Sequence, residues 1–255
     1  MTRIFYRERA RKFGSGLGDQ TQRSRSFQRN GTTRLQAPFD AACGVPARRV
    51  EGPNSDNIAI EKAGVELGKE GQVRVDEFLR TNVSHIFAGG DVIGREVGSQ
   101  MATPVGSQDG GIAAYNAFAE GEPRRVNHCV IPRTIFTDPQ IATVGLTEEE
   151  AISAGHNCWC NTVPMSLVPR AGAIRDTAGM IKMVADADGE EVLGVAMVGH
   201  TAGEVIHEAA MAMRFHAKIN DFIELLHVYP TMAEALKIVA ISRRKDPAKL
   251  SCCAE

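Results

Sequence analysis

The distribution of apolar residues divides the chain after about its first fifty residues. Residues 1–50 carry almost no periodic apolar positions and are rich in Arg, Ser, Gln and Gly. That composition is typical of a disordered or poorly packed extension, because it offers little apolar surface to bury. From about Asn57 the apolar positions become regular, so we expect folded structure from there onward.

The first part of the regular region predicts short elements of both kinds. We expect a helix at 58–64, a strand at 72–76, a short buried strand at 85–88 and a helix at 106–119. Gly121 and Pro123 then close that helix, since neither residue continues one easily. These elements predict an α/β segment over residues 54–123, preceded by the basic extension at 1–53.

A series of strand patterns follows, and helical patterns come only after it. The expected strands are 130–136, 141–144, 159–163, 180–185 and 192–198, and the expected helices are 202–216, 219–226 and 231–241. Thr147 and Glu150 have the spacing of a capping box that opens a further helix. Strands followed by helices predict an antiparallel sheet covered on one face by helices, an α+β domain over 124–246. Residues 247–255 are expected to form a flexible tail.

Charge and cysteine content narrow the class of protein. The net charge is −2, but residues 1–50 hold 11 Lys and Arg against 3 Asp and Glu, so the remainder carries −10. An acidic folded part argues against nucleic acid as a partner. No apolar run reaches the roughly 20 residues that span a bilayer, so we expect no membrane partner. Six cysteines without framework spacing predict reduced thiols in a cytoplasmic protein.

The first group of residues that could carry chemistry follows the strand expected at 85–88. Gly89, Gly90 and Asp91 end that strand and place a carboxylate at its carboxyl end. Open α/β sheets bind ligands at this edge, where a carboxylate accepts hydrogen bonds from sugar-like hydroxyls. The alternative interpretation is an Asp that only caps a helix or a turn.

The second group lies just before the last expected helix. Tyr229 precedes a proline and is therefore restricted to an extended backbone, from which its phenol can project. Thr231 and Glu234 have the spacing of a capping box, which explains the Glu structurally. We interpret His227 as a histidine whose hydrogen bonds are satisfied within the fold.

The third group is formed by cysteines. Cys252 and Cys253 are adjacent near the end of the chain, where two thiolates suit a soft metal ion that accepts few ligands. The alternative is an incidental pair on a frayed tail. Cys158 and Cys160 flank Trp159 on an expected strand, so both point to one face. We interpret these two as thiols of the core, although their spacing also permits metal binding.

Taken together, these segments resemble the pyridine nucleotide–disulfide oxidoreductase family over about residues 54–255. Residues 81–91 are similar to the family's second flavin motif, and residues 132–148 look like the entry to its dimerisation domain. The resemblance implies that Asp91 binds the ribityl chain of FAD and that Thr103 lies against the flavin. It also implies a partial FAD-binding domain at 54–123, followed by a dimerisation domain that forms a homodimer.

Two details point to one group within the family, the mercuric reductases. Dihydrolipoyl dehydrogenases and glutathione reductases have His–Pro where this chain has Tyr229–Pro230. Thiol–disulfide exchange needs an imidazole as acid and base, and a phenol is a poor substitute. The tail at 249–255 resembles the end of mercuric reductases. The resemblance implies NADPH- and FAD-dependent reduction of Hg(II) to Hg(0), with Cys252 and Cys253 capturing the ion and Tyr229 lining its route.

Several parts of that family have no counterpart in this sequence. The Gly-rich FAD fingerprint, the inner pair of cysteines spaced by four residues and the NADPH domain are not matched by residues 1–50. We therefore expect that this chain by itself does not turn over. Two alternatives stay open: a non-catalytic, dimerising Hg(II)-binding module, and a segment of another flavoprotein disulfide reductase.

Overall fold

The computed structural model describes residues 52–56, 58–118 and 120–249. The expected extension at 1–53 and the end of the expected tail, including Cys252 and Cys253, lie outside the described residues except for a few positions. Within the described residues, the buried hydrophobic side chains form two separate clusters. The smaller cluster belongs to residues up to about 128, and the larger one belongs to the sheet domain that follows.

The smaller part is built around one α-helix and several short 3-10 helices. Helix α1 (Thr103–Phe118) packs against η3 (Gly90–Ile93), and η2 (Ile60–Ala63) and η4 (Glu96–Gly98) complete the regular elements. Its core consists of Ile60, Val73, Leu79 and Ile93. The expected helix at 106–119 is therefore present and begins three residues earlier, and the helix expected at 58–64 is a single 3-10 turn.

The prediction of two strands in this part is wrong. Residues 72–76 and 85–88 form only isolated bridges, Leu67 with Val73 and Arg80 with Phe87. The reason lies in their hydrogen bonds, because the backbone N–H of Val73 donates to Val92 in η3 instead of to a neighbouring strand. Phe87 is also only half-buried, so the segment at 85–88 is not a buried strand.

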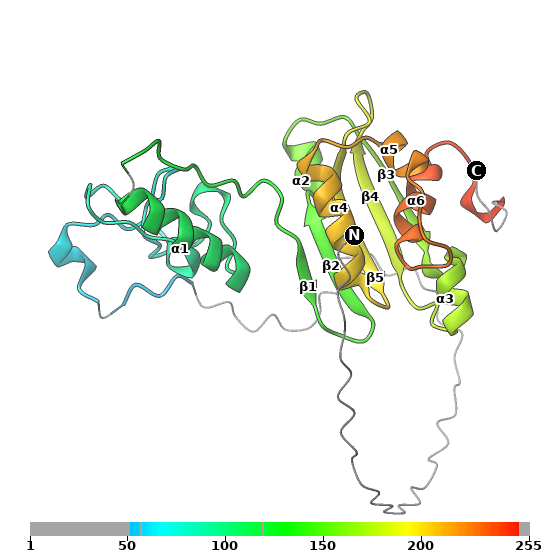
Figure 1. The fold of residues 1–255 in the computed structure, drawn as a ribbon, viewed down its shortest axis with the longest axis horizontal. Coiled ribbons are helices and arrows are strands. Elements are labelled where there is room, and N and C mark those ends of the chain that lie inside the picture. The colour runs from blue at the N-terminus through cyan, green and yellow to red at the C-terminus, as the bar shows by residue number, and fades with distance from the viewer. Residues whose placement is uncertain (1–51, 57, 119, 250–255) are drawn as a thin grey trace, which may run out of the picture. The chain divides into compact units, whose positions relative to one another are not determined.

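The larger part is a five-stranded antiparallel sheet in the order β1-β2-β5-β4-β3 (Figure 1). The strands are β1 (Arg133–Ile135), β2 (Gln140–Gly145), β3 (Cys158–Pro164), β4 (Met180–Asp186) and β5 (Val192–Gly199). All five expected strands are therefore present, and only β1 is markedly shorter than predicted. β1 and β3 form the two edges of the sheet.

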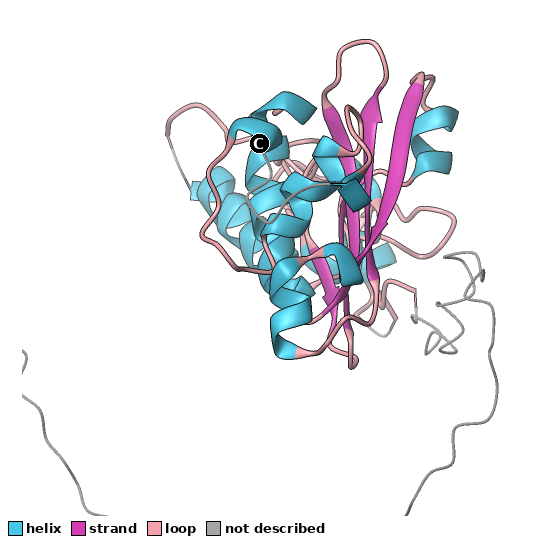
Figure 2. Ribbon diagram, turned by 90° about the vertical axis from the view of Figure 1, so that its right-hand side faces the viewer, coloured by secondary structure: helices cyan, strands magenta, loops and turns pink. Residues whose placement is uncertain are grey.

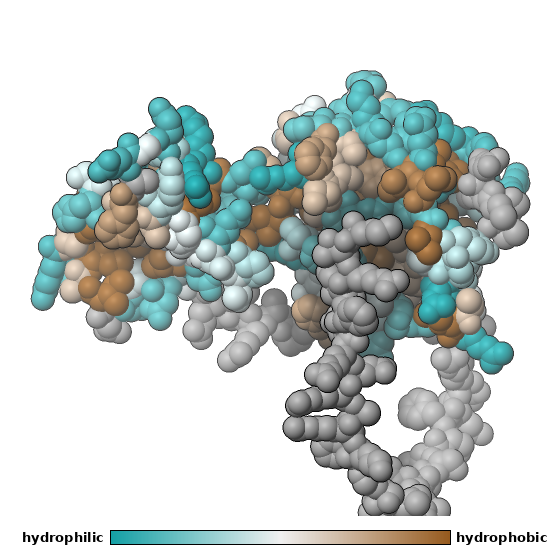
Figure 3. All heavy atoms as spheres, viewed as in Figure 1, coloured by the Kyte–Doolittle hydropathy of each residue, from teal (hydrophilic) through white to brown (hydrophobic). Residues whose placement is uncertain are grey.

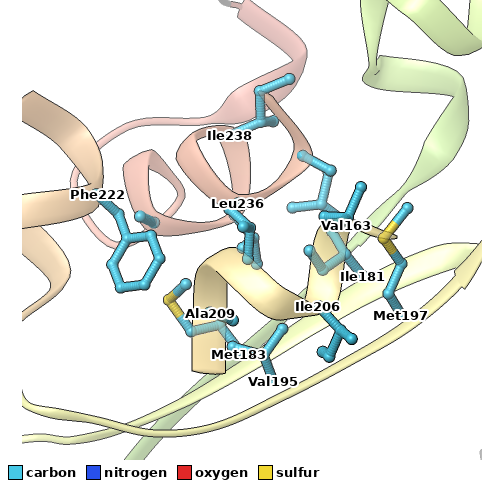
Figure 4. Close-up of a cluster of buried hydrophobic side chains, with 14 of the residues drawn as sticks. Val163, Ile181, Met183, Val195, Met197, Ile206, Ala209, Phe222, Leu236 and Ile238 are labelled. Atoms are coloured by element: carbon cyan, nitrogen blue, oxygen red, sulfur yellow. The ribbon is translucent and has the colours of Figure 1, made fainter. Parts of the chain in front are cut away.

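Three helices cover one face of this sheet, as predicted (Figure 2). They are α4 (Ala202–Arg214), α5 (Ile219–Glu224) and α6 (Glu234–Ile241). Helix α4 packs over β2 and β5, and α6 packs over β4 and β3. Alternate strand residues such as Val163, Met183 and Met197 are fully or almost fully buried beneath them, together with Ile206 and Leu236 of the helices (Figure 4).

Two short helices complete the domain. The expected capping box opens α2 (Glu148–Ser153): the Thr147 hydroxyl accepts the N–H of Glu150, whose carboxylate accepts the N–H of Thr147. Helix α2 contacts β3. Helix α3 (Pro169–Ile174), which the sequence pattern did not predict, begins with proline at its first position. No helix among the described residues is both long and apolar enough to cross a membrane.

We predict that the stability of the chain depends on the interface between the sheet and its helices. Ile206 is 1% exposed between α4 and the sheet, so Ile206→Ala should lower the free energy of unfolding by about 2–5 kcal/mol. Ile152 of α2 is 58% exposed, and Ile152→Ala should change it by less than about 0.5 kcal/mol. Urea unfolding of both variants measures the difference, and equal effects would contradict this assignment of the core.

Candidate functional site

Asp91 stands on a glycine turn that is pressed against α1. Gly90 has φ +74°, and a Cβ added to it would lie 3.1 Å from the Cα of Gly106. Both facts exclude a larger residue, because L side chains rarely adopt this φ and α1 leaves no space. The turn starts η3, so the exposed side chain of Asp91 lies at its first turn.

A buried contact between a carboxylate and an imidazole fixes this turn from the inside. Asp109 of α1 is fully buried, and its Oδ2 accepts the N–H of Gly90 at 2.9 Å. Its Oδ1 lies 2.8 Å from Nε2 of His128, whose side chain is 2% exposed. The Nδ1 of His128 lies 3.1 Å from the carbonyl of Val97, which can only accept, so Nδ1 carries a proton. Asp109 therefore joins α1, the glycine turn and the segment at 128.

The contact between Asp109 and His128 was not predicted from the sequence. Asp109 is a charged residue in the glycine-rich helical run 105–111, and a carboxylate among small residues was the signal available. Its partner lies 19 residues further along the chain, so no local pattern connects the two. Asp109 makes the hydrogen bonds that hold the turn, and Asp91 is exposed at its surface.

The residues present fit a ligand with hydroxyl groups beside η3 and α1. Thr103 is the first residue of α1 and is exposed, as is Asp91. Between them, the side-chain atoms Ser99 Oγ and Gln100 Oε1 are buried and have no hydrogen-bond partner. Buried polar atoms are normally paired in folded proteins, so these two are available to a bound polar group. The structure thus places the two residues predicted to bind FAD in the same small unit.

Tyr229 lies in the loop between α5 and α6, and an imidazole two residues earlier holds that loop. The side chain of His227 is 5% exposed, and its Nε2 lies 2.9 Å from Glu208 of α4. The hydrogen bond to Glu208 raises the pKa of His227, against the opposing effect of burial. His227 is therefore satisfied, as predicted, while Tyr229 is 53% exposed.

The capping box predicted at the start of α6 is only half formed. The Glu234 carboxylate accepts the N–H of Thr231 at 3.0 Å, but the Thr231 hydroxyl is buried without a partner. The physical reason is that α6 begins at Glu234 with Ala233 as its N-cap, so Thr231 stands outside the helix. An open hollow of about 340 Å³ lies beside this segment. Its lining residues are Arg170, His200, Thr201, Glu204, Val205, Glu208, Met232 and Ala233.

Cys252 and Cys253, the expected soft-metal ligands, lie outside the described residues, but the pair interpreted as core thiols can be described. Cys158 and Cys160 are half-buried free thiols. Burial first, and then the Glu148 carboxylate, raise the pKa of both. Within the described part of the chain, no group of three or more His, Cys, Asp or Glu side chains is placed to hold a metal ion.

Two sequence profiles place the fold and these residues in one family. The profile described as pyridine nucleotide-disulphide oxidoreductase matches residues 51–121, and the profile of that family's dimerisation domain matches residues 131–240. Together they cover more than half of the chain. The chain belongs to the pyridine nucleotide–disulphide oxidoreductase family, whose members use FAD and a pyridine nucleotide.

Two groups within the family are among the relatives that this chain resembles in sequence. Mercuric reductase of Lysinibacillus sphaericus is 42% identical over 202 residues, which are 79% of this chain and 36% of that protein. Mitochondrial dihydrolipoyl dehydrogenase of Pisum sativum is 34% identical over 76% of this chain and 38% of that protein. The chain thus spans roughly a third of the length of the curated relatives it matches.

Solved structures support the same fold. The HOCl-induced flavoprotein disulfide reductase RclA from Escherichia coli matches with a TM-score of 0.65 and 27% sequence identity. The match covers 76% of this chain and 43% of the RclA chain. The predicted fold class, a partial FAD-binding domain followed by an antiparallel dimerisation domain, is confirmed.

We predict that Glu208 controls the titration of His227. Glu208→Gln removes the charge-assisted hydrogen bond, so the pKa of His227 should fall, as measured by NMR titration of the imidazole. Because the folded pKa is the raised one, the contribution of the pair to stability is complete below the ordinary histidine pKa. It disappears as pH rises through the folded pKa.

The stability difference between the wild-type chain and Glu208→Gln should therefore be larger at pH 6 than at pH 9. Glu204→Gln, one turn earlier on α4, is the matched control and should leave the titration of His227 unchanged. A titration of His227 that is the same in all three proteins would show that the Glu208 contact is unimportant.

Proposed function

We propose that this chain is the C-terminal part of a flavin-dependent reductase whose substrate is Hg(II). The observation that carries the proposal is Tyr229, a half-exposed phenol at the position where thiol–disulfide reductases of the family have an imidazole. The 42% identity to a mercuric reductase over 79% of the chain supports it. A phenol does not exchange protons readily near neutral pH, but it can line a path for a metal ion.

In this proposal Asp91 and Thr103 hold FAD, and NADPH is the reductant that the whole enzyme uses. When bound, the flavin supplies the electron transfer. The chain's own contribution is positional: the exposed carboxylate of Asp91 accepts hydrogen bonds from hydroxyls of the cofactor, and the Asp109–His128 pair keeps its turn in place. Ser99 and Gln100 offer further polar atoms beside that turn.

The substrate in this proposal is held by sulfur. Cys252 and Cys253 capture Hg(II), because adjacent thiolates match a soft ion that accepts few ligands. Tyr229 lines the route from that pair, and the His227–Glu208 contact fixes the loop that carries it. The chain acts as a homodimer through the dimerisation domain. Leu226 and Val228, which flank His227, are 89% and 78% exposed, and Figure 3 shows apolar residues on the surface over the helices.

A second candidate is a reductase whose substrate is a disulfide instead of Hg(II). The 34% identity to a dihydrolipoyl dehydrogenase favours it, because that protein matches nearly as much of the chain. The presence of Tyr229 disfavours this second candidate, since disulfide exchange requires an acid–base group at this position. A third candidate, the non-catalytic Hg(II)-binding dimer, differs in lacking flavin. The absorption spectrum of the purified protein separates it from the other two.

We predict that the terminal thiols hold one Hg(II) ion per chain. Cys252→Ala/Cys253→Ala should lose one equivalent of Hg(II) retained in dialysis against excess monothiol, measured by mass spectrometry of the metal. The matched control Cys43→Ala/Cys129→Ala also removes two thiols and should retain the wild-type amount. Equal retention by the wild-type chain and the tail variant would reduce the proposal to a flavoprotein of unknown substrate.

A further inference from the structure

We propose that Cys158 and Cys160 on β3 form a second binding site for a soft, two-coordinate metal ion. The site is separate from the terminal thiols and does not depend on the proposed function. The two sulfurs replace their protons with two metal–sulfur bonds, and the two protons pass to solvent. Hg(II) is the probe that tests it, and Cu(I) belongs to the same chemical class.

The fold fixes the direction of both thiols. Trp159 lies between them, is partly buried and packs against the main hydrophobic cluster beneath the helices. Successive strand residues point to opposite faces, so Cys158 and Cys160 both face away from that cluster. The cross-strand partner of Cys160 is Val184, which is 3% exposed, so this second face is also covered at that point.

Helix α2 covers the face of the sheet on which the two thiols lie, and its first residue is acidic. Glu148, the first residue of α2, makes an ion pair with Lys182 of β4 at 2.7 Å. Lys182 alternates with the buried Ile181 and Met183 and therefore lies on the same face as the two thiols. Burial first, and then the nearby Glu148 carboxylate, raise the pKa of the Cys160 thiol, so the cover lies close to the sulfur. The thiols occupy a partly enclosed position between an edge strand and α2.

The geometry favours a bridging ion over a disulfide. A strand rises about 3.3–3.4 Å per residue, which puts the Cα atoms of residues two apart roughly 6.7 Å from each other. Disulfides mostly join Cα atoms about 5.5–6 Å apart, with an S–S bond of about 2.05 Å. A metal ion between two sulfurs, with bonds of about 2.3 Å each, spans a longer gap. Both thiols are free in the structure, and their spacing is near the upper limit of about 6.8 Å for a disulfide.

Titratable side chains surround the pair on this face of the sheet. Cys158 donates to the carbonyl of His156 at 3.7 Å, and Asp186 lies opposite Cys158 in the register. The imidazole of His156 lies 3.5 Å from the Asp186 carboxylate. With Glu148 and Lys182, these are the titratable groups that face the thiols. Two carboxylates beside the pair disfavour the free thiolates, whereas the dithiol and its complex with Hg(II) are both uncharged and are little affected.

The test uses the full chain in which Cys252→Ser/Cys253→Ser removes the tail thiols. This protein should retain one Hg(II) per chain in dialysis against excess monothiol. Adding Cys158→Ser/Cys160→Ser should abolish retention, whereas adding Cys43→Ser/Cys129→Ser should leave one equivalent. No retention in the tail variant, or retention without Cys158 and Cys160, would overturn the proposal. Because this protein lacks the tail thiols, a negative result here does not bear on the proposed function.

A second measurement covers the case in which the serine variants unfold. In the tail variant with all other cysteines present, Hg(II) should slow maleimide labelling of Cys158 and Cys160 at least tenfold, as mapped by peptide mass spectrometry. Cys129, an exposed single thiol, is the internal control and should be labelled at the same rate with and without the ion. Equal labelling of all three residues would contradict the site.

Discussion

The sheet domain depends on the contact between one face of the antiparallel sheet and the helices α4 and α6. Neither surface is stable in water alone, because each presents a continuous row of apolar side chains. Val163, Ile181 and Met197 of the strands interlock with Ile206 and Leu236 of the helices (Figure 4). This burial determines which residues of each strand are left for the opposite face, so it also determines where chemistry is available.

The same packing places the chemical groups at the margins of the domain. The loop after α5 carries Tyr229 outward because α6 must return across β3 and β4, and His227 holds that loop to α4. In β3, Trp159 faces the core beneath the helices, so its two cysteine neighbours face the opposite side of the sheet. The alternation that buries Trp159 in the core thus also places the two thiols side by side on the other face of the sheet.

Much of the sheet domain could be predicted from its sequence. Alternating and continuous apolar runs located β2 to β5 within about two residues, because those runs are buried and their period is unambiguous. Helix α3 was missed because six residues give too short a pattern. In the smaller part, residues 72–76 have the alternation of a strand, but Val73 bonds to a 3-10 helix, and no local pattern contains that information.

The candidate site was predictable only in part, because contacts between distant residues leave no local sequence pattern. Asp91 was predicted from the motif at 81–91 and Thr103 from the resemblance to the family; the structure places Thr103 at the start of α1, and the binding roles of both stay predictions. Thr231 has the spacing of a cap but lies outside the helix, since the helix start depends on packing. The prediction for Cys252 and Cys253 concerns residues beyond those described.

The buried contact between Asp109 and His128 has a mechanical consequence. One carboxylate holds the glycine turn, the middle of α1 and the segment leading toward the sheet. Three stretches tied to a single buried group cannot loosen one at a time, since freeing any of them leaves a charge or a donor without a partner. The turn that carries Asp91, the residue proposed to hold FAD, is therefore fixed by a buried side chain of α1, and it opens only when the whole unit does.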